Sequence, residues 1–190
     1  GAPYTDWPNR RDPDKRLKVG FVSGDFRRHP VAYFTVGLFA HLPREAVEVY
    51  AYHNHTASDD MTARIQNAVD HWRVIAEFST EAACELIRSD GIDVLIDLSG
   101  HTGYHRLDVF AKKPAPVQIS WLGFITTTGI ATVDYFAADS VILNEQTASA
   151  FVEKPLSFYH WAPLPEDIPE LDSYEKDDES FYFGSFNNAF

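Results

Sequence analysis

A short run of chemically capable side chains lies near the start of the chain. Residues 23–30, SGDFRRHP, bring a carboxylate (Asp25), two guanidinium groups and an imidazole (His29) together within eight positions. The run directly follows Leu17–Ser23, an apolar segment typical of a β-strand. Pro30 suits the first turn of a helix, whose free N–H groups could face an anion or a sugar hydroxyl. This pattern predicts a polar loop at the end of a strand.

Two later turns also carry polar side chains directly after apolar runs. Residues 99–105, SGHTGYH, contain His101, and residues 123–129, GFITTTG, contain Thr127 between glycines that permit close backbone approach. Ligands of open α/β sheets bind at the carboxyl ends of the strands. The three turns together therefore predict a pocket that binds the hydroxyl groups of a ligand. A purely structural role, in which glycine and threonine form tight turns, stays open.

The elements that must position these turns alternate between strand and helix. Strands are expected at Leu17–Ser23, Val47–His53, Trp72–Ala76, Asp93–Leu98, Val117–Phe124 and Val133–Ala138, and helices at Val31–Leu42, Met61–Val69, Thr80–Ser89 and Leu107–Lys112. The strands are apolar on both faces. This predicts an α/β fold, a Rossmann-like parallel sheet with helices on both faces.

Composition divides the chain into four parts. We expect an N-terminal extension (1–15), the sheet domain (16–162), an acidic, proline-containing connection (163–180) and a last strand (181–190). The net charge of -12 comes mostly from Glu166–Glu179, which carries eight acidic residues and one lysine. Nucleic-acid binding depends on clustered basic residues, so no nucleic-acid partner is expected.

Several classes of protein are disfavoured. The single cysteine, Cys84, excludes an internal disulfide and an all-cysteine metal site. No apolar run is long enough to cross a bilayer and no signal segment opens the chain, which predicts a cytoplasmic protein without a membrane partner. Neither the dinucleotide motif GxGxxG nor the phosphate loop GxxxxGK[ST] occurs, which disfavours nicotinamide enzymes and nucleotide triphosphatases.

The histidines allow a metal site but predict it only weakly. His53 and His55 are two residues apart, and His101 and His105 have the spacing of a zinc-protease helix without its glutamate. We therefore expect no metal. A metal-dependent hydrolase that uses His53, His55, His101 and Asp97 remains a less favoured alternative.

Several segments, in order, resemble the protein O-linked N-acetylglucosamine transferases and the related SPINDLY-type protein O-fucosyltransferases. The matching segments are Arg16–Pro30, Asp90–Gly103, Lys113–Phe124, Thr127–Ser140 and Phe183–Phe190. The resemblance implies that the chain is the N-terminal lobe of a GT-B glycosyltransferase, in which two Rossmann-like lobes enclose the substrates. It also implies a C-terminal lobe and tetratricopeptide repeats elsewhere in the parent protein.

The resemblance also implies roles for individual residues. Asp25 and His29 match the catalytic region near the reacting sugar, and Pro30 lies beside them. The backbone of Leu122 and Gly123 matches the pair that lies against the donor sugar. The expected substrate-binding residues are Pro30, His101, Leu122, Gly123 and Thr127.

The implied reaction is an inverting transfer to Ser or Thr hydroxyls of acceptor proteins. The donor is UDP-N-acetylglucosamine or GDP-fucose, no cofactor or metal is required, and the lobe is inactive alone because the diphosphate-binding lysine belongs to the other lobe. The alternative is a non-catalytic protein-binding module on the same fold. Ile125, which replaces a proline found in many family members, favours that alternative slightly, whereas the retained Asp25, His29 and Pro30 argue against it.

Overall fold

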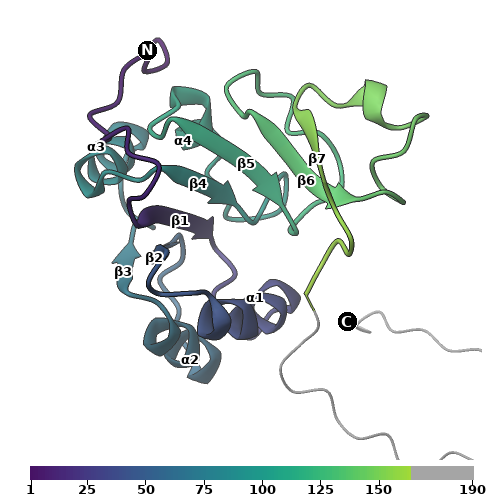
Figure 1. The fold of residues 1–190 in the computed structure, drawn as a ribbon. Helices are drawn as coiled ribbons and strands as arrows, with labels where there is room; N and C mark the ends of the chain where they lie inside the picture. The colour runs from purple at the N-terminus through teal and green to yellow at the C-terminus, as the bar shows by residue number, and fades with distance from the viewer. Residues whose placement is uncertain (164–190) are drawn as a thin grey trace, which may run out of the picture.

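The computed structural model describes residues 1–163 (Figure 1). The strands are β1 (Leu17–Ser23), β2 (Val47–His53), β3 (His71–Val74), β4 (Val94–Asp97), β5 (Val117–Trp121), β6 (Tyr135–Asp139) and β7 (Lys154–Phe158). The helices are α1 (Pro30–His41), α2 (Asp60–Ala68), α3 (Thr80–Asp90) and α4 (Leu107–Lys112), with a 3₁₀ turn at Ala148–Ala150.

The strands form one parallel sheet in the order β3-β2-β1-β4-β5-β6-β7. Helices α1 and α2 lie on one face, and α3 and α4 lie on the other (Figure 1). The expected parallel sheet with helices on both faces is therefore confirmed. The strand order reverses between β1 and β4, and such a reversal opens a crevice at the carboxyl ends of the strands.

Alternation along the strands divides the core into two layers. Phe21 packs beneath α1 and α2, in one cluster with Phe39 and Ile65, whereas its neighbour Val22 packs with Cys84 of α3 and Phe110 of α4. Successive side chains of a strand point to opposite faces, so a strand between two helical layers must be apolar on both. The continuous apolar runs in the sequence reflect this arrangement.

Two differences from the expected elements concern the second half of the sheet. Strand β5 ends at Trp121, because Leu122 adopts a left-handed backbone conformation with φ of 70°. Strand β7 was not expected at all. Among the described residues, β7 is an edge strand that pairs only with β6. Its sequence, KPLSF, contains a proline and mostly exposed side chains, so it lacks the apolar pattern of the inner strands.

The N-terminal extension packs against the sheet domain. The amide of Tyr4 donates to the carbonyl of Lys112, and Trp7 Nε1 donates to the carbonyl of Lys113 at 3.0 Å. Almost all of the predicted connection (163–180) and the whole predicted last strand (181–190) lie outside the described residues. Within residues 1–163, no helix is long and apolar enough to cross a membrane.

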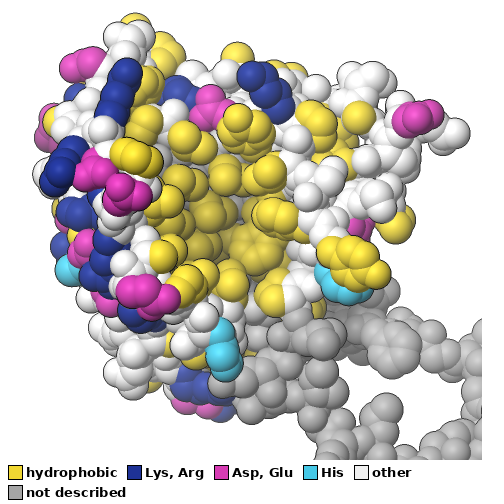
Figure 2. Space-filling model, viewed as in Figure 1, with side chains coloured by type: hydrophobic (Ala, Val, Ile, Leu, Met, Phe, Trp, Pro, Cys, Tyr) yellow, Lys and Arg dark blue, Asp and Glu magenta, His cyan; other side chains and the backbone are white. Residues whose placement is uncertain are grey.

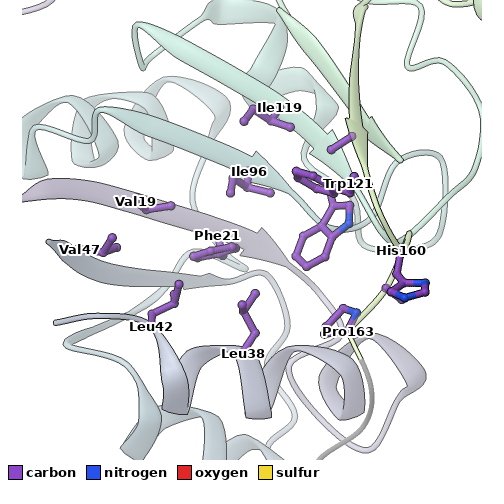
Figure 3. A pocket seen from close by; sticks show the side chains of 13 residues that line it. Val19, Phe21, Leu38, Leu42, Val47, Ile96, Ile119, Trp121, His160 and Pro163 are labelled. Carbon is purple, nitrogen blue, oxygen red and sulfur yellow. The ribbon is translucent and has the colours of Figure 1, made fainter. Parts of the chain in front are cut away.

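An apolar groove of about 760 Å³ lies on the sheet face that carries α1 (Figures 2 and 3). Helix α1 covers β1 and β2, but no described helix covers β4, β5 and β6 on that face. The groove is lined by strand residues such as Ile96, Ile119 and Trp121, and by Leu38 of α1. Residues from the end of β7 to Pro163 complete the lining: Phe158, His160, Ala162 and Pro163. None of the predicted site residues lines it.

Candidate functional site

The three predicted loops leave the carboxyl ends of neighbouring strands. Residues 24–29 follow β1, residues 98–106 follow β4, and residues 122–134 follow β5. Because β1, β4 and β5 are adjacent and parallel, their loops share one edge of the sheet. The loops also touch one another, since a β-carbon on Gly24 would lie 2.4 Å from Cβ of Tyr104, and one on Gly100 would lie 2.6 Å from Cβ of Phe124.

Asp25 and His29 lie side by side in the loop after β1. Asp25 is only 5 % exposed, and its carboxylate oxygens lie 3.5 Å from Nη2 of Arg27 and 3.8 Å from Nδ1 of His29. No hydrogen bond from the described residues reaches this carboxylate. Arg28 instead forms a bidentate pair with Asp60 at 2.7 and 2.8 Å. The loop therefore holds a sheltered carboxylate beside an imidazole.

The backbone N–H groups in the first turn of α1 already have hydrogen-bond acceptors on His29. His29 is the N-cap residue, and its Nδ1 accepts a hydrogen bond from the amide of Val31 at 3.3 Å. Pro30 has no N–H, and the amide of Ala32 donates to the carbonyl of His29. The expectation of free N–H groups at this helix start was therefore wrong. Within residues 1–163, the capping contact engages Nδ1 of His29, and Nε2 forms no hydrogen bond.

Asp97 anchors the loop after β4. Its side chain is fully buried and accepts hydrogen bonds from the amides of Ser99 and Gly100, at 3.1 and 2.9 Å, and from Oγ of Ser120, at 2.9 Å. Burial raises the pKa of Asp97 above its ordinary value, although these hydrogen bonds act in the opposite direction. The carboxyl group thus joins the loop after β4 to β5.

The backbone at Leu122 and Gly123 turns sharply. The amide of Gly123 donates to the carbonyl of Trp121 at 2.8 Å, which closes a three-residue turn around Leu122 at φ of 70°. A left-handed non-glycine residue costs on the order of 1–3 kcal/mol and persists only where its surroundings hold it. The Leu122 side chain is buried in the core. The pair that was expected to face the donor sugar is therefore fixed in an uncommon conformation.

His101 and Thr127 connect the second and third loops. Nε2 of His101 lies 3.1 Å from the carbonyl oxygen of Thr127, and the exposed His101 ring meets Phe124 edge to face. The Thr127 hydroxyl donates to Glu153 at 2.7 Å and accepts from the amides of Gly129 and Val152. The structure brings these two predicted residues together, and their role in substrate binding stays a prediction.

Three buried polar residues that support the loops were not predicted. Glu153 contacts the loop after β5, while Arg106 donates to the carbonyl of Ile75 at 3.0 Å and to Asn54 Oδ1 at 3.3 Å. Asn54 in turn donates to the carbonyl of Tyr104 at 2.8 Å. Asn54 stands between His53 and His55 and Arg106 directly follows the turn at residues 99–105, but their partners are distant in the sequence, so the sequence alone offers no signal for these contacts.

The side chains proposed for a metal site are occupied elsewhere. His53 is buried against the rings of Phe26 and Trp72, its Nε2 faces the carbonyl oxygen of Ala57, and burial lowers its pKa. Asp97 binds the loop after β4 as described. Among residues 1–163, no three His, Cys, Asp or Glu side chains are arranged to hold a metal ion.

Known proteins match this chain over most of its length. A protein "Probable UDP-N-acetylglucosamine--peptide N-acetylglucosaminyltransferase SPINDLY" from Hordeum vulgare is 34% identical over 195 residues, which cover 98% of this chain and 21% of that protein. The protein with the same name from Arabidopsis thaliana is 34% identical over 193 residues, 97% of this chain and 21% of its own length. The chain thus spans about a fifth of these relatives.

A solved structure confirms the expected lobe. The "Thermobaculum terrenum O-GlcNAc transferase mutant - K341M" superposes with a TM-score of 0.85 and 38% sequence identity, over 92% of this chain and 34% of that one. This likeness confirms that the chain has the predicted fold, the Rossmann-like N-terminal lobe of a GT-B glycosyltransferase. The model of glycosyl transferase family 41 matches residues 1–162. On this sequence and structural agreement, the chain belongs to glycosyl transferase family 41.

Proposed function

We propose that this chain is one lobe of an inverting protein O-glycosyltransferase that transfers a sugar from a nucleotide-sugar to Ser or Thr hydroxyls of proteins. In this reaction the hydroxyl oxygen bonds to the anomeric carbon while the bond from that carbon to the diphosphate breaks, and the hydroxyl proton passes to a base. The observation that carries the proposal is the sheltered Asp25–His29 pair, at the same sheet edge as the turn at Leu122 and Gly123.

The geometry supports different roles for Asp25 and His29. The Val31 amide donates to Nδ1 of His29, which favours the neutral tautomer with its proton on Nε2. That Nε2–H group is a donor, suited to orienting a sugar or phosphate oxygen. Asp25 has unused acceptor capacity and is therefore our candidate for accepting the proton, directly or through a water molecule.

For the donor, we propose UDP-N-acetylglucosamine. The names of the relatives from barley and Arabidopsis specify UDP-N-acetylglucosamine, and the solved relative is named an O-GlcNAc transferase. GDP-fucose, the second donor that the sequence resemblance implies, is the comparison. We further propose that the lobe is inactive alone, because the described residues offer no cluster of free cations for a departing diphosphate at this edge, and that no metal or cofactor takes part.

The test compares donor turnover by the full-length parent enzyme, with each nucleotide-sugar and an acceptor protein. Asp25→Asn should lower kcat by about 10²–10⁴-fold, the usual contribution of a general base. Asp60→Asn is the matched control, because Asp60 is an exposed aspartate that pairs with Arg28 and has no contact with Asp25. It should retain activity.

Three outcomes would each contradict a part of the proposal. If the folded parent turned over neither donor, a non-catalytic protein-binding module would replace the enzyme. If Asp25→Asn and Asp60→Asn were equally active, Asp25 would not be the base. The isolated 190-residue chain should show no turnover under the same conditions, and turnover by it would refute the requirement for a second lobe.

A further inference from the structure

Glu153 is a buried carboxyl group, and within the part of the chain that the structure describes its side-chain hydrogen bonds all come from the loop after β5. It lies just before β7, is 3 % exposed, and accepts bonds from Thr127 Oγ1 at 2.7 Å and from the Thr128 amide at 2.8 Å. The Thr128 hydroxyl donates to the same oxygen as the Thr128 amide. Within residues 1–163, no Lys, Arg or His forms an ion pair with it.

This arrangement has a high energetic cost unless every bond is made. A carboxylate taken out of water must recover its lost solvation from protein donors. For Glu153 these donors belong to two consecutive residues that lie 25 and 26 positions away in the chain. The carboxylate therefore fixes the backbone and both side chains of Thr127 and Thr128 at once.

The constraint passes on to His101. Because the Thr127 hydroxyl donates to Glu153 and accepts from the amides of Gly129 and Val152, its position is fully determined. The Thr127 carbonyl oxygen then lies 3.1 Å from Nε2 of His101. Thr127 thus links a buried acid, through its hydroxyl, to an exposed imidazole in the adjacent loop, through its carbonyl.

We propose that Glu153 is a positioning residue for the donor sugar, acting through Thr127 and Thr128 on the loop after β5 and on His101. This inference rests on the proposed glycosyltransferase function, because it assigns these loops to the donor site. It adds a residue outside the predicted loops to the set that determines donor affinity. Glu153 itself does not contact the reacting atoms.

The kinetic test uses Glu153→Gln in the full-length parent enzyme. Glutamine keeps the size of the side chain but places an NH₂ group against one of the loop donors. The KM for the nucleotide-sugar should rise about tenfold or more, because a loop displaced by a fraction of an ångström no longer fits the sugar. The KM for the acceptor protein should stay unchanged. Glu145→Gln, an exposed glutamate of the same connection between β6 and β7, is the matched control.

A second pair of variants tests the same contact without altering Glu153. Thr128→Val removes the hydroxyl that donates to Glu153, while Thr128→Ser keeps it. The donor KM should be raised in the valine variant and should stay within about threefold of the wild-type value in the serine variant. This pair decides the question if Glu153→Gln does not fold. A wild-type donor KM in both Glu153→Gln and Thr128→Val would overturn the proposal.

Hydrogen exchange separates this inference from the proposed function. The Thr128 amide donates to Glu153, so peptides covering residues 123–130 should exchange faster in Glu153→Gln than in the wild type or in Glu145→Gln. Unchanged exchange would overturn the positioning role even in an active enzyme. If the wild-type parent turned over no donor, the proposed function and the donor-positioning role would both fail, and faster exchange would then establish only a structural contact.

Discussion

Gly123 lies directly against the backbone of Leu98, so that a β-carbon built on Gly123 would stand 2.0 Å from the Leu98 carbonyl oxygen. Leu98 follows β4 and Gly123 follows β5, and these strands are neighbours in the sheet. The contact therefore sets how closely the two loops approach each other. Only glycine permits this approach, because the obstructing atom belongs to the backbone and cannot rotate away.

Replacing Gly123 by alanine should therefore separate the loops. We expect Gly123→Ala to reduce the free energy of unfolding by about 1–3 kcal/mol, the usual cost of forcing extra atoms into a packed region. Gly103→Ala is the matched control, because a β-carbon there would meet no atom within 4 Å. Chemical unfolding of both variants measures the difference. Equal stability of the two would show that the loops can move apart without cost.

The fold was readable from the sequence because the inner strands are apolar on both faces. Phe21 and Val22 belong to opposite core layers, and such pairs produce the continuous apolar runs that predict buried parallel strands. Strand β7 lacks that signal because it lies at the edge and contains Pro155. Periodicity locates buried elements well and edge elements poorly.

The candidate site was only partly readable. Glycine-bounded turns after apolar runs located the three loops, but the contacts that hold them join residues far apart in the sequence. Arg106 reaches Asn54 across 52 positions, and Glu153 reaches Thr127 across 26. A lone Arg or Glu in an irregular segment looks like a surface residue, and only the folded chain shows that these two are buried.

Asp93 should make the stability of the chain depend on pH. Burial alone would raise its pKa, but hydrogen bonds from Lys15, from the Lys18 amide at 3.0 Å and from Asn9 at 2.7 Å hold the pKa below its ordinary value of 3.8. A lowered pKa gives a stabilisation that is complete above pH 3.8 and is lost as the pH falls through the folded-state value.

Asp93→Asn should consequently be less stable than the wild type at pH 7, by about 2 kcal/mol for charge-assisted hydrogen bonds. The deficit should stay constant from pH 7 down to about pH 4 and should shrink as the pH falls below 3.8 through the folded-state pKa, where the wild-type carboxylate becomes protonated. Thermal unfolding from pH 7 to about pH 2 provides the measurement. A deficit that stays constant over that whole range would mean that the charge on Asp93 contributes nothing.

Arg106 and Asn54 should be energetically coupled. Both are buried, and together they join the loop after β4 to the ends of β2 and β3. Arg106→Met removes the donor to Asn54 Oδ1 and leaves the Ile75 carbonyl only its bond from the Phe78 amide, at a cost of about 1–3 kcal/mol. A double-mutant cycle with Asn54→Ala should give a coupling energy above about 0.5 kcal/mol, whereas additive effects would show that the two residues act independently. Arg10→Met, at an exposed pair, is the control.

Cys84 should be unreactive while the chain is folded. It is the only cysteine, lies fully buried between α3 and α4, and its pKa is raised to about 11, chiefly by burial and further by the charge of Asp108. At pH 8 almost none of the thiol is then ionised, and the thiolate is the form that reacts. A disulfide reagent should modify one thiol per chain at once in denaturant and, without denaturant, only as fast as the fold opens. Rapid modification of the native chain would place Cys84 near the surface and would contradict its assignment to the core beneath α3.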